Sequence, residues 1–340
     1  MTVRCGDTLL FQTLPVIAAG AAVGGKKESE GPLAAEVDEL SADNRFGQSS
    51  WEAAEKYLQL RAARLCLQKA ALPQEKVQLA LAGDLQAQCT ASSYAMRELG
   101  VPFAGLFGAC STMAEGLALG AALCEGGAAL ADGLLAMTSS HFCTAERQFR
   151  TPLSYGAVRT PTAQWTATAA GCCLLQPQGE GVGIAAATFG RVQDYQVKDI
   201  NNMGAAMAPA AASTLLHYFK DTGTEPQEFD CIYTGDLGQV GSQLLRELLA
   251  AEGLLIKNHV DCGCILFDAN EQSVKSGGSG PGCCAAVLCG HILPRLRRGS
   301  QKRVLFTATG ALMSQTTFLQ KETIPAVAHL VELRAPEKEK

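Results

Sequence analysis

A short pattern occurs twice in this chain and constrains its fold more than any other feature. Each copy is an apolar run that ends in Gly-Asp-Leu, and the copies are Leu81–Leu85 and Tyr233–Leu237. A second pair of runs, Gly133–Ser140 and Arg303–Gly310, ends in small hydroxyl residues in both copies. Because the two pairs recur at offsets of about 150 to 170 residues, we expect a duplicated α/β unit.

Short apolar runs alternate with longer helical stretches in both halves. In the first half we expect helices over about 51–71, 93–99 and 111–125, and strands over about 77–82, 101–107, 133–138 and 166–175. In the second half we expect helices over about 207–220 (opened by Pro209), 242–251 and 283–296, and strands over about 182–189, 231–234, 262–267, 304–309 and 327–333. This alternation predicts largely parallel, buried sheets, with one half over residues 1–178 and the other over 179–340.

The composition indicates a large buried core and excludes several kinds of partner. Of the 340 residues, 47% are hydrophobic and only 18% are charged. The net charge of −5 provides no basic surface, so we expect no nucleic-acid partner. No apolar run reaches the roughly 20 residues that span a bilayer, and we recognise no signal peptide. We therefore expect a reducing compartment and no transmembrane segment.

The 14 cysteines do not resemble a disulfide framework. Several lie within apolar runs, where a free cysteine behaves as a small hydrophobic residue. Zinc binding is the alternative for Cys262 with Cys264 and for the pair Cys283 and Cys284. Neither group supplies two CxxC half-sites backed by histidines, so we predict no metal site.

Cys110 is the main candidate for chemistry. It follows a predicted strand and precedes a predicted helix, and ligands of α/β sheets bind at this edge. The positive end of the helix dipole can lower the pKa of a thiol there. A nucleophilic thiol also needs a base, and His141 is the histidine that the pattern places at the same edge. The alternative for His141 is a role in ordering the loop.

Two arginines follow His141 and are candidates for binding an anion. Arg147 and Arg150 lie three residues apart, and arginine forks suit carboxylates. The alternative is a solvated or salt-bridged loop in which Glu146 is the partner.

The order of these motifs resembles the stage V sporulation protein AD family, within the thiolase superfamily. The motifs that carry the resemblance are Ala82–Leu85, Phe107–Thr112, Ser139–His141, Thr144–Arg150, Met207–Ala212, Thr234–Leu237, Asp261–Gly263, Gly277–Gly280, Ala308–Leu312, Lys321–Pro325 and Ala328–His329. The resemblance implies an α/β, thiolase-like fold in which two duplicated halves pack in an αβαβα layering.

The resemblance also implies a role in sporulation. Members of this family belong to the machinery that moves dipicolinic acid, pyridine-2,6-dicarboxylate, into the forespore, and they bind it while associated with membrane partners. We therefore expect dipicolinate or its calcium chelate as ligand and other stage V proteins of the dipicolinate channel as partners. The expected location is the cytoplasmic side of the forespore inner membrane, as a peripheral protein. Superfamily members also commonly form homodimers through the edge of the first-half sheet.

The second half departs from the catalytic pattern of the superfamily. The condensing enzymes have a histidine after the strand that here ends in Thr234–Asp236, and this chain has none there. They have an asparagine in a glycine-rich turn that corresponds to 277–280, where this chain has Ser279. Because a base and an oxyanion donor are both missing, we expect no condensation activity. The alternatives are an acyltransferase that pairs Cys110 with His141, and a structural adaptor whose pocket is vestigial.

A binding site for a dianion such as dipicolinate needs cations, hydroxyl groups and helix-terminal N–H groups. We expect these donors from residues of the first half: Cys110, Ser139, Ser140, His141 and Arg147. Ser279 stands in the matching turn of the second half. Asp84 and Asp236 either hold donors in place or accept from a bridging Ca²⁺. We expect no cofactor other than calcium carried in by the chelate.

Overall fold

The computed structural model describes residues 2–127, 132–149 and 159–337. The first half contains five adjacent strands in the order β6-β5-β7-β9-β3, and the second contains five in the order β12-β11-β14-β15-β10. Their bounds are β3 Val16–Gly24, β5 Leu79–Gly83, β6 Phe103–Gly105, β7 Leu134–Ser140, β9 Ala169–Gln176, β10 Val182–Thr188, β11 Cys231–Thr234, β12 His259–Asp261, β14 Arg303–Ala311 and β15 Ala326–Arg334.

The pairing directions are the same in both halves, as expected of a duplication. β5 pairs in parallel with β6 and β7, and β9 runs antiparallel to β7 and β3. β11 pairs in parallel with β12 and β14, and β15 runs antiparallel to β14 and β10. The sheets are therefore mixed, not largely parallel as predicted. The reason is that the segment after β14 returns directly alongside it, without the long crossover that a parallel neighbour needs.

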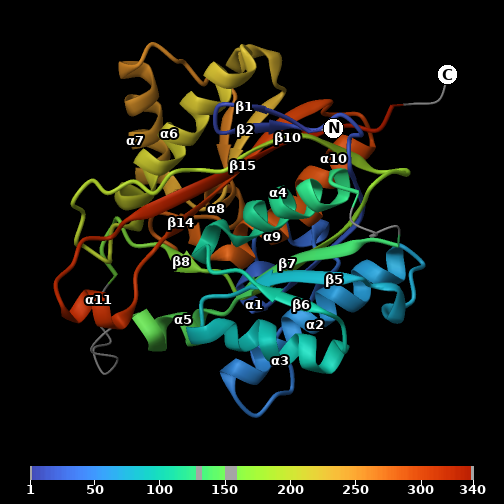
Figure 1. Ribbon diagram of the computed structural model, residues 1–340. Helices are drawn as coiled ribbons and strands as arrows, with labels where there is room; N and C mark the ends of the chain where they lie inside the picture. The colour runs from blue at the N-terminus through green and yellow to red at the C-terminus, as the bar shows by residue number, and fades with distance from the viewer. Residues whose placement is uncertain (1, 128–131, 150–158, 338–340) are drawn as a thin grey trace.

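Helices cover the sheets in three layers (Figure 1). The helices are α2 Trp51–Lys69, α3 Thr90–Leu99, α4 Thr112–Glu125, α6 Met203–Thr222, α7 Gly238–Ala251 and α9 Pro281–Val287. Leucines and alanines of α2 and α3 pack on the first sheet, and those of α6 and α7 pack on the second. α4 and α9 share the central core between the sheets. This arrangement is the predicted αβαβα layering, because each sheet buries two apolar faces.

The two sheets meet through a short antiparallel contact between β10 and β3, where Val182 is opposite Ile17. β3 is the strand of the first half that meets the second half, but it is absent from the strands predicted above. Its sequence is mostly alanine, glycine and valine, and it lies almost entirely buried. The hairpin β1 Val3–Cys5 and β2 Thr8–Leu10 pairs with β10, so the start of the chain lies on the second sheet.

One predicted element of the second half is wrong, and a second is correct but begins earlier than predicted. Cys262–Phe267 is not a strand: α8 Cys262–Leu266 is a helical turn, and the strand is the preceding β12. The helix predicted to open at Pro209 begins earlier, because the Asn202 side chain accepts a hydrogen bond from the Ala205 N–H and caps α6. A buried helical turn and a buried strand are equally apolar, so hydrophobicity alone could not separate them.

Within the described residues, no helix combines the length and the apolar character that a membrane crossing would need.

Candidate functional site

A cavity of about 540 Å³ opens where the two halves meet, at the ends of the strands. This size is typical of small-molecule sites. Its lining combines apolar side chains with amides and a few charged groups, and includes Asp84, Gln86, Phe107, Cys110, Glu146, Gln148, Arg159, Gln164, Met203, Met207, Ser279, Leu312 and Met313. Short strands β8 Trp165–Thr166 and β13 Gly278–Ser279 pair along one side of it.

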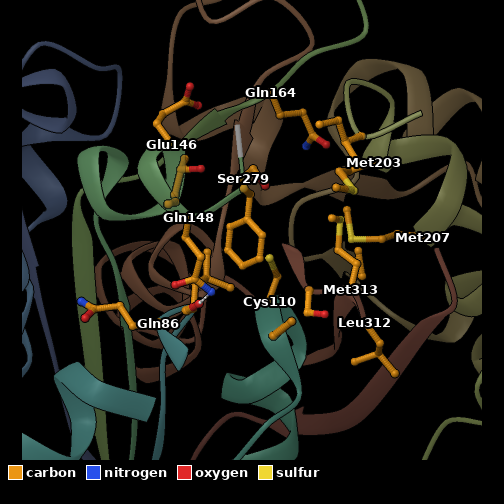
Figure 2. Close-up of a pocket in the computed structure, with 18 of the residues that line it drawn as sticks. Gln86, Cys110, Glu146, Gln148, Gln164, Met203, Met207, Ser279, Leu312 and Met313 are labelled. Atoms are coloured by element: carbon orange, nitrogen blue, oxygen red, sulfur yellow. Dashed lines mark hydrogen bonds between the residues drawn. The ribbon is translucent and has the colours of Figure 1, made fainter. Parts of the chain in front are cut away.

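Opposite walls of the cavity differ in chemistry (Figure 2). Gln86 and Gln148, from the first half, lie on one side of Cys110, and Met203, Met207 and Met313, from the second half, lie on the other. Gln148 lies on α5 Phe142–Phe149. Amides donate and accept hydrogen bonds, whereas thioethers offer a polarizable apolar surface that suits a ring or chain. The cavity therefore suits a ligand with a polar edge and an apolar face.

Cys110 lies in a tight turn, Ala109–Ser111, immediately before α4. The Cβ of an alanine at Gly310 would come within 2.2 Å of the Gly108 oxygen, so only glycine lets the end of β14 approach this turn. Burial raises the pKa of the Cys110 thiol well above its usual value, and the Asp236 carboxylate raises it further. The helix dipole does not lower this pKa in the way that the position in sequence suggested.

Asp236 follows β11 and is completely buried behind Cys110. Its Oδ2 accepts hydrogen bonds from Gly280 N at 2.9 Å and Ser279 Oγ at 3.2 Å, and its Oδ1 accepts from Thr309 Oγ1 at 2.9 Å. Burial raises the pKa of Asp236 to about 6. Gly280 adopts a φ of +91°, which lets its N–H point at the carboxylate.

This geometry favours a neutral thiol. A carboxylate that is charged above pH 6 repels a thiolate beside it, so it holds the proton on Cys110 instead of removing it. None of the five histidines, all of which the structure describes, lines the cavity.

Asp84 also lines the cavity, but its carboxylate is already occupied. Oδ2 accepts from Ser92 N at 2.8 Å and Ser92 Oγ at 2.6 Å, and Oδ1 accepts from Gln86 N at 2.8 Å. It therefore orders the loop that carries Gln86. Behind it lies the buried Glu55 of α2, and burial together with the charge of Asp84 raises the pKa of Glu55 to about 8. The sequence analysis did not consider Glu55, because a helical position gives no signal of this pairing.

Ser139, Ser140 and His141 do not line the cavity, contrary to the prediction. Ser139 Oγ contacts Glu55 at 3.2 Å, and Ser140 Oγ donates to Ala167 O at 2.7 Å. The ring of His141 is held between Asn44 O, at 2.9 Å from Nε2, and the backbone N–H of Cys143, at 3.1 Å from Nδ1.

Both ring nitrogens of His141 are thus used within the protein. Burial lowers the pKa of His141, so the ring is neutral and supplies no charge to an anion. The alternative reading, a histidine that orders its loop, is the one that the structure supports.

Arg147 is also not a cavity residue. Its side chain is 54% exposed and pairs with Glu52 of α2. The helix α5 turns this side chain outward, toward α2, and its partner is Glu52 where the sequence suggested Glu146. Arg150 lies outside the described residues.

The cation that does line the cavity is Arg159, which the sequence analysis missed. It pairs with Glu146, and its Nη1 donates to Gln164 O at 2.7 Å. No motif marks Arg159, because it lies in a polar connecting segment. Among the described residues, no cluster of three or more histidine, cysteine or acidic side chains has the arrangement of a metal site.

Comparison with solved structures shows that the fold of this chain is thiolase-like. A 3-oxoacyl-[acyl-carrier-protein] synthase III from Aquifex aeolicus superposes with a TM-score of 0.55 at 12% identity, over 94% of this chain and 99% of that one. Cerulenin-bound OleA from Xanthomonas campestris superposes with a TM-score of 0.58 at 16% identity, over 98% of this chain and 99% of that one.

The family model described as stage V sporulation protein AD matches residues 5–334. Stage V sporulation protein AD of Bacillus subtilis (strain 168) is 41% identical over 324 residues, which cover 95% of each chain. The chain therefore belongs to the stage V sporulation protein AD family, and the resemblance drawn from its motifs is confirmed. It is a sporulation protein with a thiolase-like fold.

Proposed function

We propose that this protein binds a small molecule in the cavity beside Cys110 without transforming it. The buried Asp236 carboxylate, which accepts a hydrogen bond from Gly280 N and raises the pKa of the Cys110 thiol, carries the proposal. A nucleophilic cysteine needs a neighbour that accepts its proton and stabilises the thiolate. Asp236 is instead an acid whose negative charge opposes the thiolate, in the half of the protein where condensing enzymes carry a histidine.

The proposed ligand is dipicolinate, free or as its calcium chelate. This assignment rests on the family and on the two walls of the cavity: a planar pyridine ring can lie against the methionines while its carboxylates face the opposite, polar wall. The Asp84 carboxylate favours the chelate, because calcium offsets the charge of the ligand. No cofactor enters the proposal other than this calcium.

Calorimetry with the full chain tests the ligand. Dipicolinate is titrated with and without Ca²⁺, and phthalate serves as a dianion that has no ring nitrogen. We expect dipicolinate to bind and phthalate to bind more weakly. No heat with dipicolinate up to millimolar concentration, in either condition, would refute this function.

The proposed setting is the cytoplasmic side of the forespore inner membrane, with other stage V proteins of the dipicolinate channel as partners and no nucleic acid. A homodimer is also proposed, through β6. This strand ends the first sheet, and its residues Ala104 and Gly105 are exposed. An unpaired edge offers N–H and C=O groups to a second chain. Sedimentation of the wild type and of Ala104→Pro tests this, and a monomeric wild type would exclude it.

An acyltransferase is the second candidate, because Cys110 lines the cavity at the turn before α4. It predicts an acylated Cys110 after incubation with acyl-CoA. Intact-mass measurement that shows no adduct across several chain lengths would remove this candidate.

A further inference from the structure

Arg159 has the properties of a residue that recognises an anion in the cavity. Among the residues that the structure describes, it is the only lysine or arginine in the lining. Its side chain is only 12% exposed. A guanidinium that is held away from bulk water interacts with a carboxylate more strongly than an exposed one does.

The surroundings of Arg159 hold the guanidinium in place. It lies 5.2 Å from the ring centre of Phe142 and 5.0 Å from that of Trp165, and these two rings stack 3.7 Å apart. Nη1 donates to the main-chain oxygen of Gln164 at 2.7 Å. A guanidinium group that is already ordered loses little conformational entropy when a ligand binds.

Gln164, whose main-chain oxygen accepts from Arg159, is itself held in place. Its Nε2 donates to Asp236 O at 2.6 Å and to Gly278 O at 2.9 Å, which fixes the orientation of the amide. Its Oε1 is buried and, within the part of the chain that the structure describes, has no hydrogen-bond partner. Figure 2 shows this side chain reaching from the top of the cavity toward the side of Met203. A buried acceptor without a partner is costly, so a water that donates to it would be stabilised, whereas a dianion has no hydrogen to donate.

Glu146 forms an ion pair with Arg159 at the rim of the cavity. The Glu146 side chain is 20% exposed, and Figure 2 shows its carboxylate pointing away from Cys110. Water can therefore solvate this carboxylate when it leaves the guanidinium. A ligand carboxylate that enters from the cavity offers Arg159 an equivalent partner.

We infer that Arg159 recognises a carboxylate of the ligand and that Glu146 holds the same guanidinium until the ligand replaces it. The inference rests on the proposed function for the identity of the ligand, but the carboxylate exchange itself requires only an anionic ligand. Glu146 is then an internal competitor, and its removal strengthens binding. A purely structural ion pair predicts the opposite, because losing either partner would then weaken the site.

The test measures binding by calorimetry to the full-length wild type and to Arg159→Gln, Arg159→Lys, Glu146→Gln and Arg147→Gln. The ligands are dipicolinate, isophthalate, which keeps both carboxylates without the ring nitrogen, and the neutral dimethyl ester of dipicolinate. Arg147→Gln is the matched control, because it removes an equal charge from an exposed arginine that is also paired with a glutamate. Thermal unfolding of each variant identifies any that fail to fold.

We expect Arg159→Gln to weaken binding of the dianions by about tenfold to a hundredfold, the effect of one charged hydrogen-bonding group. Arg159→Lys should recover part of this loss, Glu146→Gln should bind severalfold more tightly, and Arg147→Gln should match the wild type. The ester should bind poorly to all of them. The gain in Glu146→Gln is the decisive result, because misfolding cannot produce it.

The outcomes separate this inference from the proposed function. If the wild type binds dipicolinate and Arg159→Gln binds it equally well, or Glu146→Gln weakens binding, the inference is refuted and the function stands. If the wild type binds isophthalate through Arg159 but not dipicolinate, the function is refuted and the inference stands. If neither dianion binds, both are refuted.

Discussion

The carboxylate of Asp236 raises the pKa of the Cys110 thiol, although the two residues come from opposite halves of the duplicated fold. The two groups are brought together because the turn before α4 and the turn after β11 meet at the junction of the two halves. This arrangement places an acid where a catalytic cysteine would need a base.

This arrangement predicts that Cys110 reacts slowly with thiol reagents. Alkylation by iodoacetamide near pH 8, followed by mass spectrometry, should modify the exposed Cys5 well before Cys110. Asp236→Asn should accelerate alkylation of Cys110, because it removes the negative charge that raises the pKa of the thiol. An unchanged rate in Asp236→Asn would show that burial alone protects the sulfur.

Substitutions at Cys110 should affect ligand binding according to charge. Cys110→Ala removes a neutral part of the cavity wall and should weaken dipicolinate binding by less than about fivefold, within 1 kcal/mol. Cys110→Asp places a second carboxylate beside Asp236 and should abolish measurable binding. Calorimetry measures both variants, and thermal unfolding checks that Cys110→Asp is folded. Equal affinities in the wild type and both variants would place the ligand elsewhere.

Glu55 should make the protein less stable as the pH rises. Its pKa is 4.5 when exposed and about 8 in the folded protein. Between these values the unfolded chain releases a proton that the folded chain keeps, so the free energy of unfolding falls with increasing pH, by up to about 1.4 kcal/mol per pH unit. Below pH 4.5 the Glu55 carboxyl group is protonated in both the folded and the unfolded chain, so it no longer lowers the free energy of unfolding.

Glu55→Gln should remove this part of the pH dependence. Urea unfolding of the wild type and of the variant at pH 5, 6, 7 and 8 should show curves that diverge, with Glu55→Gln relatively more stable at pH 8. Parallel curves would mean that Glu55 ionises in the folded protein near its ordinary pKa.

His141 should matter for stability and not for the ligand. His141→Ala removes two hydrogen bonds and a contact with the Trp51 ring, whose centre lies 5.4 Å away. We expect the free energy of unfolding to fall by about 2 to 4 kcal/mol, as for other buried aromatic truncations. Affinity for dipicolinate, per folded molecule, should not change.

The half-exposed His217 provides the matched control, and His217→Ala should cost less than about 1 kcal/mol. If His141→Ala instead lost binding at full stability, the original interpretation of His141 as a ligand residue would be restored.

Elements with strong local signals were predicted well. α2 begins after Ser50, whose side chain accepts a hydrogen bond from the Ala53 N–H, and α3 ends at Gly100 in a left-handed conformation. β11 has the predicted bounds. β3 was not predicted because its run of alanine and glycine shows neither the helical nor the strand periodicity of apolar residues. This segment forms a strand because it pairs with β9 and β10.

The site was predicted less completely than the fold. Cys110 and Ser279 line the cavity as expected, and Asp236 lies directly behind Cys110. His141 and Arg147 do not, because their partners, Asn44 and Glu52, come from about a hundred residues earlier in the chain. No sequence motif marks Arg159, and only the tertiary structure shows that it lines the cavity.

The sequence by itself determined the duplicated α/β plan, the strand-to-helix turn at Cys110 and the family, because these depend on local patterns and ordered motifs. Only the tertiary structure decided which side chains face the cavity. That choice depends on contacts between segments far apart in the chain, such as those that turn His141 toward Asn44 and Arg147 toward Glu52. Residue type indicates what a side chain can bind, but packing determines what it contacts.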